Sequence, residues 1–135
     1  MSTDPSEELT VRAFVHPDRV ERWLTKLANP KHRSQAVDRI SSEHDWDTRW
    51  YVDVSPTGGR EALIARIDTM LRERSAPDDC RVMSPTASLD GRTMPLREAL
   101  ESVVGRKAAL VICVPGKLAY WEGEPPSLRQ ILARP

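Results

Sequence analysis

The longest apolar run in the chain is Ala108 to Val114, which lies between Arg106-Lys107 and the pair Pro115-Gly116. An unbroken apolar run of this length, bounded by turn residues, is typical of a strand that is covered on both faces, so it predicts the middle of a sheet. A second strand, Lys117 to Glu122, follows and should fold back antiparallel. Because Pro-Gly prefers a type II turn, which fits a two-residue hairpin poorly, we expect a longer loop or a bulge there.

Four further segments have strand patterns. Leu9 to Val15 alternates apolar and polar residues, Arg49 to Val54 is rich in aromatic and branched residues, and Cys80 to Ser84 precedes a turn at Asp90-Gly91. The segment from Leu128 to Arg134 fits either a helix or an edge strand, and its place next to the hairpin favours the strand.

Apolar residues recur at helical spacing in four other segments. The helices are expected to begin at Pro17, at about Lys31, at Arg60 and at Pro95, the last being closed by Gly105. The apolar face of the second helix, running to about Ser42, is thin, which indicates a peripheral helix or one that meets a partner.

The order of these elements predicts an α/β domain that borders on α+β. Its middle part reads βαβαβ, and crossovers of this length join parallel strands. We therefore expect a single domain over residues 9–135, with a mixed sheet of four to six strands, a parallel βαβαβ core, an antiparallel carboxyl-terminal hairpin and helices packed on the sheet. Residues 1–8 are expected to be a disordered lead-in.

Composition narrows the function classes. The 135 residues carry a formal net charge of zero, so no overall field attracts nucleic acid, which makes nucleic acid an unfavoured partner. No stretch is long and apolar enough to span a membrane, and the polar, acidic amino terminus is unlike a signal peptide. A cytoplasmic protein without membrane contact is the expectation.

The two cysteines, Cys80 and Cys113, both fall in predicted strands. In the cytoplasm each is expected to be a buried, reduced thiol that packs as a small apolar group. A disulfide between them requires the two strands to be neighbours.

One candidate site follows from the expected parallel strands. The first two of the expected parallel strands, which end at Val54 and Met83, both run into the tripeptide Ser-Pro-Thr, and ligands of open parallel sheets bind beyond the carboxyl ends of the strands. Hydroxyls, flexible backbone and guanidinium groups at this edge would form a pocket for a phosphate or carboxylate. The residues expected to line this pocket are Ser55, Thr57, Gly58, Gly59, Arg60, Ser84, Thr86 and Arg92. The same residue types also make ordinary loops and helix caps, and no Walker or GxGxxG pattern is present.

Two weaker candidates remain. Two histidines and two carboxylates, namely His32, Glu43, His44 and Asp45, have donor types that suit a divalent metal. Their spacing matches no metal signature, so a solvated loop is the ordinary interpretation and no metal is expected. A basic stretch, made of Lys26, Lys31, His32, Arg33 and Arg39, resembles a face that tracks phosphates, with Trp23 or Trp46 available for stacking.

No motif for nucleophilic catalysis or for a cofactor is present, and Cys113 lies inside the apolar run. The leading hypothesis is a non-catalytic binding or interaction domain, whose partner is another protein or a second copy of this chain. It depends on the thin helix and on tryptophans near segments expected to be exposed, because Trp is enriched at interface centres. The alternative is a small-molecule binder or enzyme that acts on a phosphorylated or carboxylated ligand at the strand ends.

Overall fold

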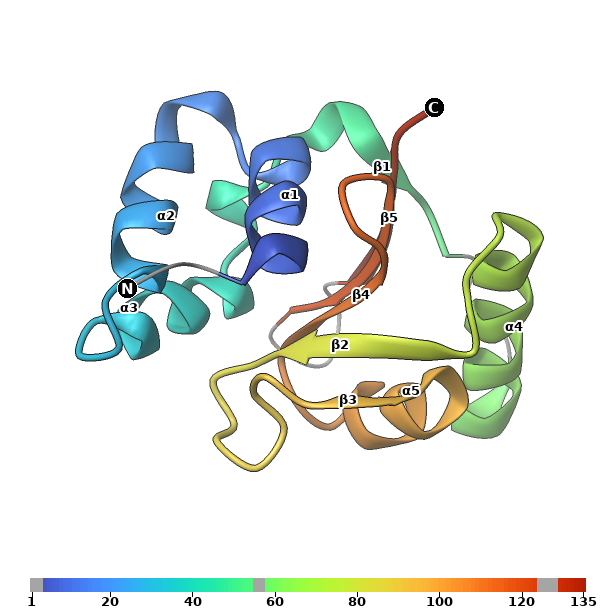
Figure 1. The fold of residues 1–135 in the computed structure, drawn as a ribbon. Coiled ribbons are helices and arrows are strands. Elements are labelled where there is room, and N and C mark those ends of the chain that lie inside the picture. Colours follow the sequence, from blue (N-terminus) through green and yellow to red (C-terminus); the bar gives the residue numbers. More distant parts are fainter. Residues whose placement is uncertain (1–3, 55–57, 124–128) are drawn as a thin grey trace.

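The computed structural model describes residues 4–54, 58–123 and 129–135. In these residues the chain forms one domain of three layers, a six-stranded antiparallel sheet with helices on both faces (Figure 1). The strands, in their order across the sheet, are β1 (Tyr51–Val52), β6 (Arg129–Ala133), β5 (Leu118–Glu122), β4 (Ala109–Val114), β2 (Asp79–Met83) and β3 (Thr93–Pro95).

The helices divide between the two faces according to their place in the sequence. The first face carries α1 (Pro5–Phe14), α2 (Val20–Leu27), α3 (Arg33–Val37) and the 3-10 turns η1 (Pro17–Arg19), η2 (Asp38–Ser41) and η3 (Glu43–Asp45). A fourth 3-10 turn, η4 (Thr48–Trp50), leads into β1. The second face carries α4 (Gly59–Glu73) and α5 (Leu96–Val103).

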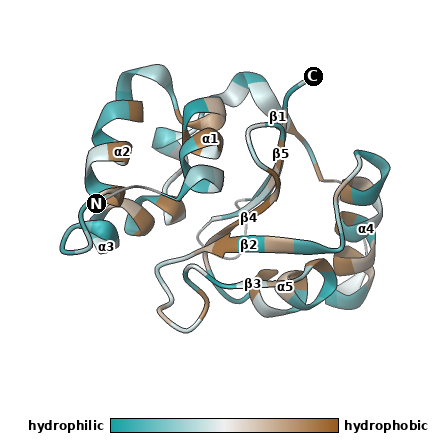
Figure 2. Cartoon of the chain, viewed as in Figure 1, coloured by the Kyte–Doolittle hydropathy of each residue, from teal (hydrophilic) through white to brown (hydrophobic). Residues whose placement is uncertain are grey.

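The central strand β4 shows why the sheet needs both layers. Leu110 and Ile112 pack into the core under α1 and α2, whereas Ala109, Val111 and Cys113 pack into the core under α4 and α5. Each fully buried large apolar side chain contributes about 1.5–3 kcal/mol, so both layers stabilise the same strand. Apolar colouring accordingly concentrates where helices and sheet meet (Figure 2). The predicted central strand is confirmed.

The carboxyl-terminal hairpin is also confirmed, together with its irregularity. The backbone N–H of Lys117 donates to the carbonyl of Val114 at 2.9 Å, and Gly116 has φ of 77°, as a turn with Pro115 and Gly116 at its centre requires. The pairing register of β4 and β5 shifts between Ile112 and Val114, so a bulge accompanies the turn. The segment favoured as a strand at the carboxyl terminus forms β6.

The predicted parallel βαβαβ core is wrong, because the sequence pattern did not reveal the short strand β3. This strand pairs antiparallel with β2, Asp79 opposite Pro95, and carries the chain back to the start of β2. Helix α5 then returns to the far end of the sheet, so β4 runs antiparallel to β2. The strands β1 and β2 do run in one direction, but β6, β5 and β4 lie between them.

The predicted strand at Leu9 to Val15 is also wrong: these residues lie in and just after helix α1, which begins at Pro5, inside the segment expected to be disordered. The Asp4 carboxylate accepts hydrogen bonds from the backbone N–H groups of Ser6 (2.9 Å) and Glu7 (3.2 Å) and so caps the helix. Leu9, a core residue in the strand interpretation, is 53% exposed.

Three of the four tryptophans are buried, contrary to the interaction hypothesis, which places them at an exposed surface, and Trp50 is half-buried. Trp23, Trp46 and Trp121 are buried, and their rings contact one another in series, with centroid distances of 5.6 Å and 5.9 Å. The thin helix is a short α3 followed by η2, and its apolar residues Ala36, Val37 and Ile40 are all buried in the same core. Packing within the domain therefore accounts for these residues.

Candidate functional site

Two described residues of the predicted anion pocket, Arg60 and Ser84, bind backbone groups of the protein itself. The Arg60 Nε donates to the carbonyl of Val104 at 2.8 Å, and its Nη2 donates to the carbonyl of Glu101. This guanidinium therefore caps the carboxyl-terminal end of α5 instead of facing a ligand. Gly58 and Gly59 form the start of α4.

The second half of that pocket is similarly occupied. The buried Ser84 hydroxyl donates to the carbonyl of Ala108 at 2.7 Å and accepts the backbone N–H of Thr86 at 3.0 Å, while the Arg92 side chain is exposed. Ser55 and Thr57 lie outside the described residues.

The two loops are also far apart. They follow β1 and β2, which have three strands between them, and at about 4.8 Å per strand spacing this separates the strand ends by roughly 19 Å. The structure therefore does not bring the described candidates of the two loops into one pocket.

Three of the metal candidates, His32, His44 and Asp45, do not converge, and the side chain of Glu43 lies outside the described part of the structure. Asp45 is held by Trp23 and Arg39, and the exposed His32 lies 3.2 Å from the Gln35 amide through its Nδ1. His44 is exposed on η3. In the described part of the chain no group of three or more His, Cys, Asp or Glu side chains is placed to hold a metal ion.

The basic stretch divides into two parts. Arg33 belongs to an internal network: its guanidinium contacts the fully buried Glu7 carboxylate at 2.8 and 2.9 Å and the Asp90 carboxylate at 2.7 and 2.9 Å. Arg81 adds a third bond to Glu7 at 2.9 Å. These ion pairs connect α1 and α3 to β2 and to the turn that follows it, so Arg33 has a structural role.

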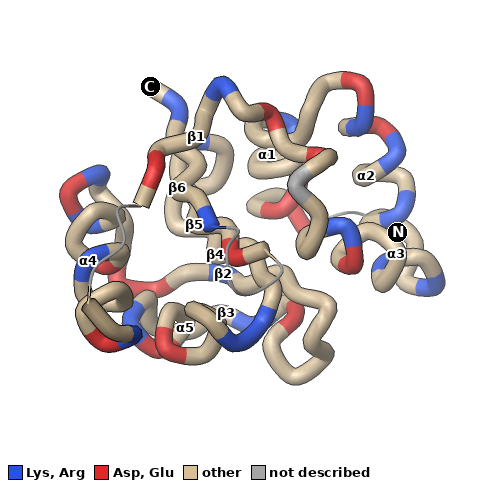
Figure 3. The backbone as a smooth tube through the Cα atoms, turned by 180° about the vertical axis from the view of Figure 1, so that it is seen from behind, with Lys and Arg blue, Asp and Glu red and all other residues tan. Residues whose placement is uncertain are grey.

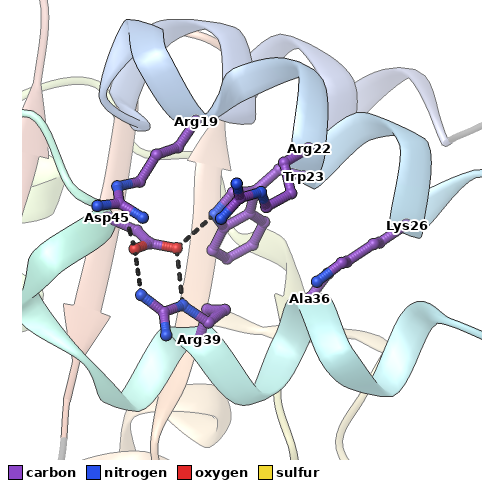
Figure 4. A pocket seen from close by; sticks show the side chains of 7 residues that line it. All are labelled: Arg19, Arg22, Trp23, Lys26, Ala36, Arg39 and Asp45. Carbon is purple, nitrogen blue, oxygen red and sulfur yellow. Dashed lines mark hydrogen bonds and ion pairs between the residues drawn. The ribbon is translucent and has the colours of Figure 1, made fainter.

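Lys26 and Arg39, in contrast, line a hollow on the surface of the first helical layer. The hollow has a volume of about 150 Å³ and lies between α2 and η2. Its walls are Arg19, Arg22, Trp23, Lys26, Ala36, Arg39 and Asp45 (Figure 4). Four cationic side chains thus surround one carboxylate, which leaves three positive charges in excess. Lys and Arg positions along α2 and beside α3 are visible in Figure 3.

Asp45 organises one wall of this hollow. Its carboxylate accepts the indole N–H of Trp23 at 2.9 Å and two hydrogen bonds from Arg39, at 2.6 and 3.0 Å, and Arg19 lies 3.7 Å away. Burial acts to raise the pKa of the Asp45 carboxyl, but the hydrogen bonds from Arg39 and Trp23 and the nearby guanidinium charges together lower it below its usual value. The carboxylate therefore stays ionised and fixes Arg39.

Arg39 and Arg19 both form ion pairs with Asp45, whereas Arg22 and Lys26 do not. Within the described residues neither takes part in an ion pair or a side-chain hydrogen bond. Both come from α2, and with Arg19 they are spaced at i, i+3 and i+7, which places them on one side of the helix. The hollow therefore presents two cationic groups that form no ion pair with a described residue.

A second hollow continues the first. It has a volume of about 480 Å³, shares Arg19 and Arg22 with its neighbour, and is completed by His16, Asp18 and His44. We call the two hollows together the basic groove. A ligand with more than one anionic group fits such a groove, because one group can occupy the smaller hollow while the rest extends towards the histidines.

Sequence reasoning had found Lys26 and Arg39 but missed Arg19 and Arg22. The available signal was their spacing along the helix, which repeats the spacing of a single face. The convergence with Arg39 and Asp45 comes from tertiary packing and has no signal in the sequence.

A buried charged cluster on the other face has a structural explanation. The Glu122 carboxylate accepts the hydroxyl of Tyr120 at 2.5 Å, the Nη2 of Arg129 at 3.2 Å and the backbone N–H of Gly105 at 3.1 Å. Burial raises the pKa of the Tyr120 hydroxyl, and the adjacent carboxylate raises it further. The cluster joins β5 and β6 to the loop after α5, and its hydrogen bonds leave Glu122 engaged on both oxygens.

Comparison with known proteins identifies no relative: no protein-family model matches the chain, and no curated protein or solved structure is significantly similar to it. Among the described helices, none has the length and apolar character that crossing a membrane requires.

Proposed function

We propose that this protein is a non-catalytic binding protein whose basic groove takes a small ligand bearing more than one phosphate group. The observation that carries the proposal is that Arg22 and Lys26 line the hollow and form no ion pair with a described residue. Cationic groups gathered on one concave surface raise the local concentration of anions and attract them.

The number of charges favours phosphate over carboxylate. The smaller hollow has three positive charges in excess of Asp45. One phosphate group carries about −1.5 to −2 charges near neutral pH, so a phosphate group in this hollow balances more of the excess than a single carboxylate does.

The type of cation favours phosphate as well. Three of the four cations are arginines, whose planar guanidinium groups bind phosphate oxygens through two parallel hydrogen bonds. Arg39 is held in place by its two bonds to Asp45, so less side-chain entropy is lost when it also contacts a ligand. Trp23 closes the inner wall of the hollow.

We infer a binding function because the carboxylate of the smaller hollow, Asp45, is already engaged in internal hydrogen bonds. Asp45 is ionised and accepts hydrogen bonds from Trp23 and Arg39, which is the arrangement of a positioning group rather than of a general acid or base. The expectation that the protein binds a protein partner or a second copy of itself remains a prediction.

Titration calorimetry with inorganic pyrophosphate at low salt tests the proposal. Arg22→Gln removes a cation that makes no ion pair or side-chain hydrogen bond with a described residue, so we expect affinity to fall roughly tenfold, the loss of one charge-assisted hydrogen bond. The matched control is Arg66→Gln, which removes an exposed arginine of α4 on the other face. Equal affinities of the native protein and the Arg22→Gln variant, or no heat of binding at all, would contradict the proposal.

A further inference from the structure

The two cysteines, which are distant in the sequence, lie on neighbouring strands. Cys80 belongs to β2 and Cys113 to β4, and the antiparallel register pairs Arg81 with Ile112 and Val82 with Val111. Continuing this register by one residue places Cys80 directly opposite Cys113. Both residues belong to the core under α4 and α5, so their side chains lie on the same face of the sheet.

The backbone hydrogen bonds define which kind of pair this is. The N–H of Val82 donates to the carbonyl of Arg92 at 2.8 Å, and the carbonyl of Val82 accepts the N–H of Gly91 at 2.7 Å, so both polar groups of Val82 point away from β4. Residues two apart in a strand point their backbone groups in the same direction, so those of Cys80 also point away from β4. Cys80 and Cys113 therefore form a non-hydrogen-bonded pair.

This geometry suits a covalent link. The Cα atoms of a non-hydrogen-bonded antiparallel pair are about 4.5 Å apart, with the side chains close together, and disulfides are formed at Cα separations of about 4.4–6.8 Å. The bulge in β4 falls between Ile112 and Val114, so Cys113 has no paired residue on β5. A small movement of Cys113 towards β2 therefore disturbs few ladder hydrogen bonds.

We propose that Cys80 and Cys113 are a thiol modification site, which a small-molecule disulfide oxidises to an intramolecular cross-strand disulfide. One cysteine thiolate attacks the small disulfide, which forms a mixed disulfide and releases one small thiol. The second cysteine thiolate then attacks the protein sulfur of the mixed disulfide and releases the second small thiol. The protein loses two protons and two electrons, and the small disulfide is reduced to two thiols.

The reaction is expected to be slow in the folded protein. Both residues are 4% exposed, and burial raises the pKa of the Cys80 thiol to about 12 and raises that of Cys113 as well. Because the thiolate is the attacking species, oxidation proceeds through local opening at this end of β2 and β4. Once formed, the link joins two neighbouring strands near the middle of the sheet and stabilises the fold.

The test is to incubate the native protein with oxidised glutathione without denaturant, and then to denature it in N-ethylmaleimide and measure its intact mass. We expect a monomer that is lighter by two hydrogen atoms, carries no maleimide and is returned to two free thiols by dithiothreitol. Cys80→Ser and Cys113→Ser, treated alike, should carry one maleimide or one glutathione. Because either variant could lose stability, the oxidised native protein is also compared with the reduced one by thermal unfolding, in which it should melt at a higher temperature.

Three results would overturn the proposal. One is native protein that still carries two maleimides after incubation with oxidised glutathione, although both of its thiols react with a small aromatic disulfide in urea. Another is a persistent product with two glutathiones, which shows that the cysteines do not reach each other. The third is a disulfide-linked dimer.

Discussion

The indole N–H of Trp23 on α2 donates to the buried carboxylate of Asp45 on η3 at 2.9 Å. The same carboxylate binds the Arg39 guanidinium, so a single acidic residue joins α2, η2 and η3 around the smaller hollow of the basic groove. Asp45 accordingly has two opposing effects: it stabilises the wall of the groove and it reduces the positive charge that the groove offers to an anion.

Replacing Asp45 by Asn separates these two effects. The variant keeps the size of the side chain but loses the charged hydrogen bonds to Arg39, whose side chain is 44% exposed. Solvent screening limits the loss, and we expect unfolding free energy to fall by about 1 kcal/mol while affinity for pyrophosphate rises. Urea unfolding and calorimetry measure the two quantities. Asp38→Asn, an exposed neighbour on η2, is the control, and a fall of affinity in Asp45→Asn would contradict the role assigned here.

Lowering the pH should reduce the free energy of unfolding by protonating Asp45 and Asp47. The hydrogen bonds from Arg49 lower the pKa of the Asp47 carboxyl, and the Arg39 and Trp23 bonds outweigh burial in lowering that of Asp45. A carboxyl with a lowered folded-state pKa contributes stability above its unfolded pKa of about 3.9, and this contribution is lost as pH falls through the folded pKa. The stability difference between the native chain and the double variant Asp45→Asn, Asp47→Asn should therefore be constant at neutral pH and shrink below about pH 4. The urea unfolding midpoints of the two proteins, measured across this pH range, test this prediction. A stability difference that grows towards acid pH would refute it.

Glu7 should be among the polar residues to which stability is most sensitive. Glu7→Gln removes a fully buried carboxylate and leaves Arg33 and Arg81, both about one-quarter exposed, without one of their partners. Breaking such a buried network costs about 3 kcal/mol. The adjacent Glu8→Gln is a matched control, because Glu8 pairs with Arg12 at the exposed surface and its loss should cost less than about 0.5 kcal/mol. Equal urea midpoints of the two variants would contradict this ranking.

The end of α4 offers a stabilising substitution. Ser75 has φ of 74°, and the N–H of Ala76 donates to the carbonyl of Leu71 at 3.1 Å, as in a helix closure that normally uses glycine. Ser75→Gly relieves the left-handed strain, and we expect a gain of about 0.5–1 kcal/mol in unfolding free energy. Thermal unfolding beside Ser75→Ala, which keeps the strain, provides the comparison. A lower melting temperature for the glycine variant than for the alanine variant would count against this explanation.

Sequence patterns predicted those elements in which the local residue pattern and the tertiary packing favour the same structure. The run at Ala108 to Val114 is apolar enough to require two covering layers, and Gly105, with φ of 69°, follows α5 as expected. The helix α1 could not be distinguished from a strand by alternation, because Leu9 is apolar yet exposed. The three-residue strand β3 has no periodicity to detect, and missing it reversed the inferred direction of β4.

The candidate site was harder to predict than the fold. Arg60 and Ser84 have the residue types of an anion pocket, but the carbonyls that they bind come from α5 and from the residue before β4, which only the tertiary structure brings near. The basic groove depends on the approach of η2 and η3 to α2. Lys26 shares one side of a helix with Arg19 and Arg22, which their spacing indicates, but the approach of Arg39 to these three residues is not predictable from spacing along one element.

The most direct test of the central claim is a nitrogen-15 NMR titration with inorganic pyrophosphate, observed at the tryptophan indole N–H groups. The Trp23 indole lines the hollow, whereas that of Trp121 is buried and donates to the carbonyl of Ile40 at 2.6 Å, which makes it an internal reference. We predict that the Trp23 signal, assigned with Trp23→Phe, shifts and saturates while the Trp121 signal stays in place. Two results would contradict the assignment of the basic groove as the binding site. One is a Trp23 signal that does not move, and the other is a Trp23 signal that shifts without saturating, as it would in a control titration with chloride.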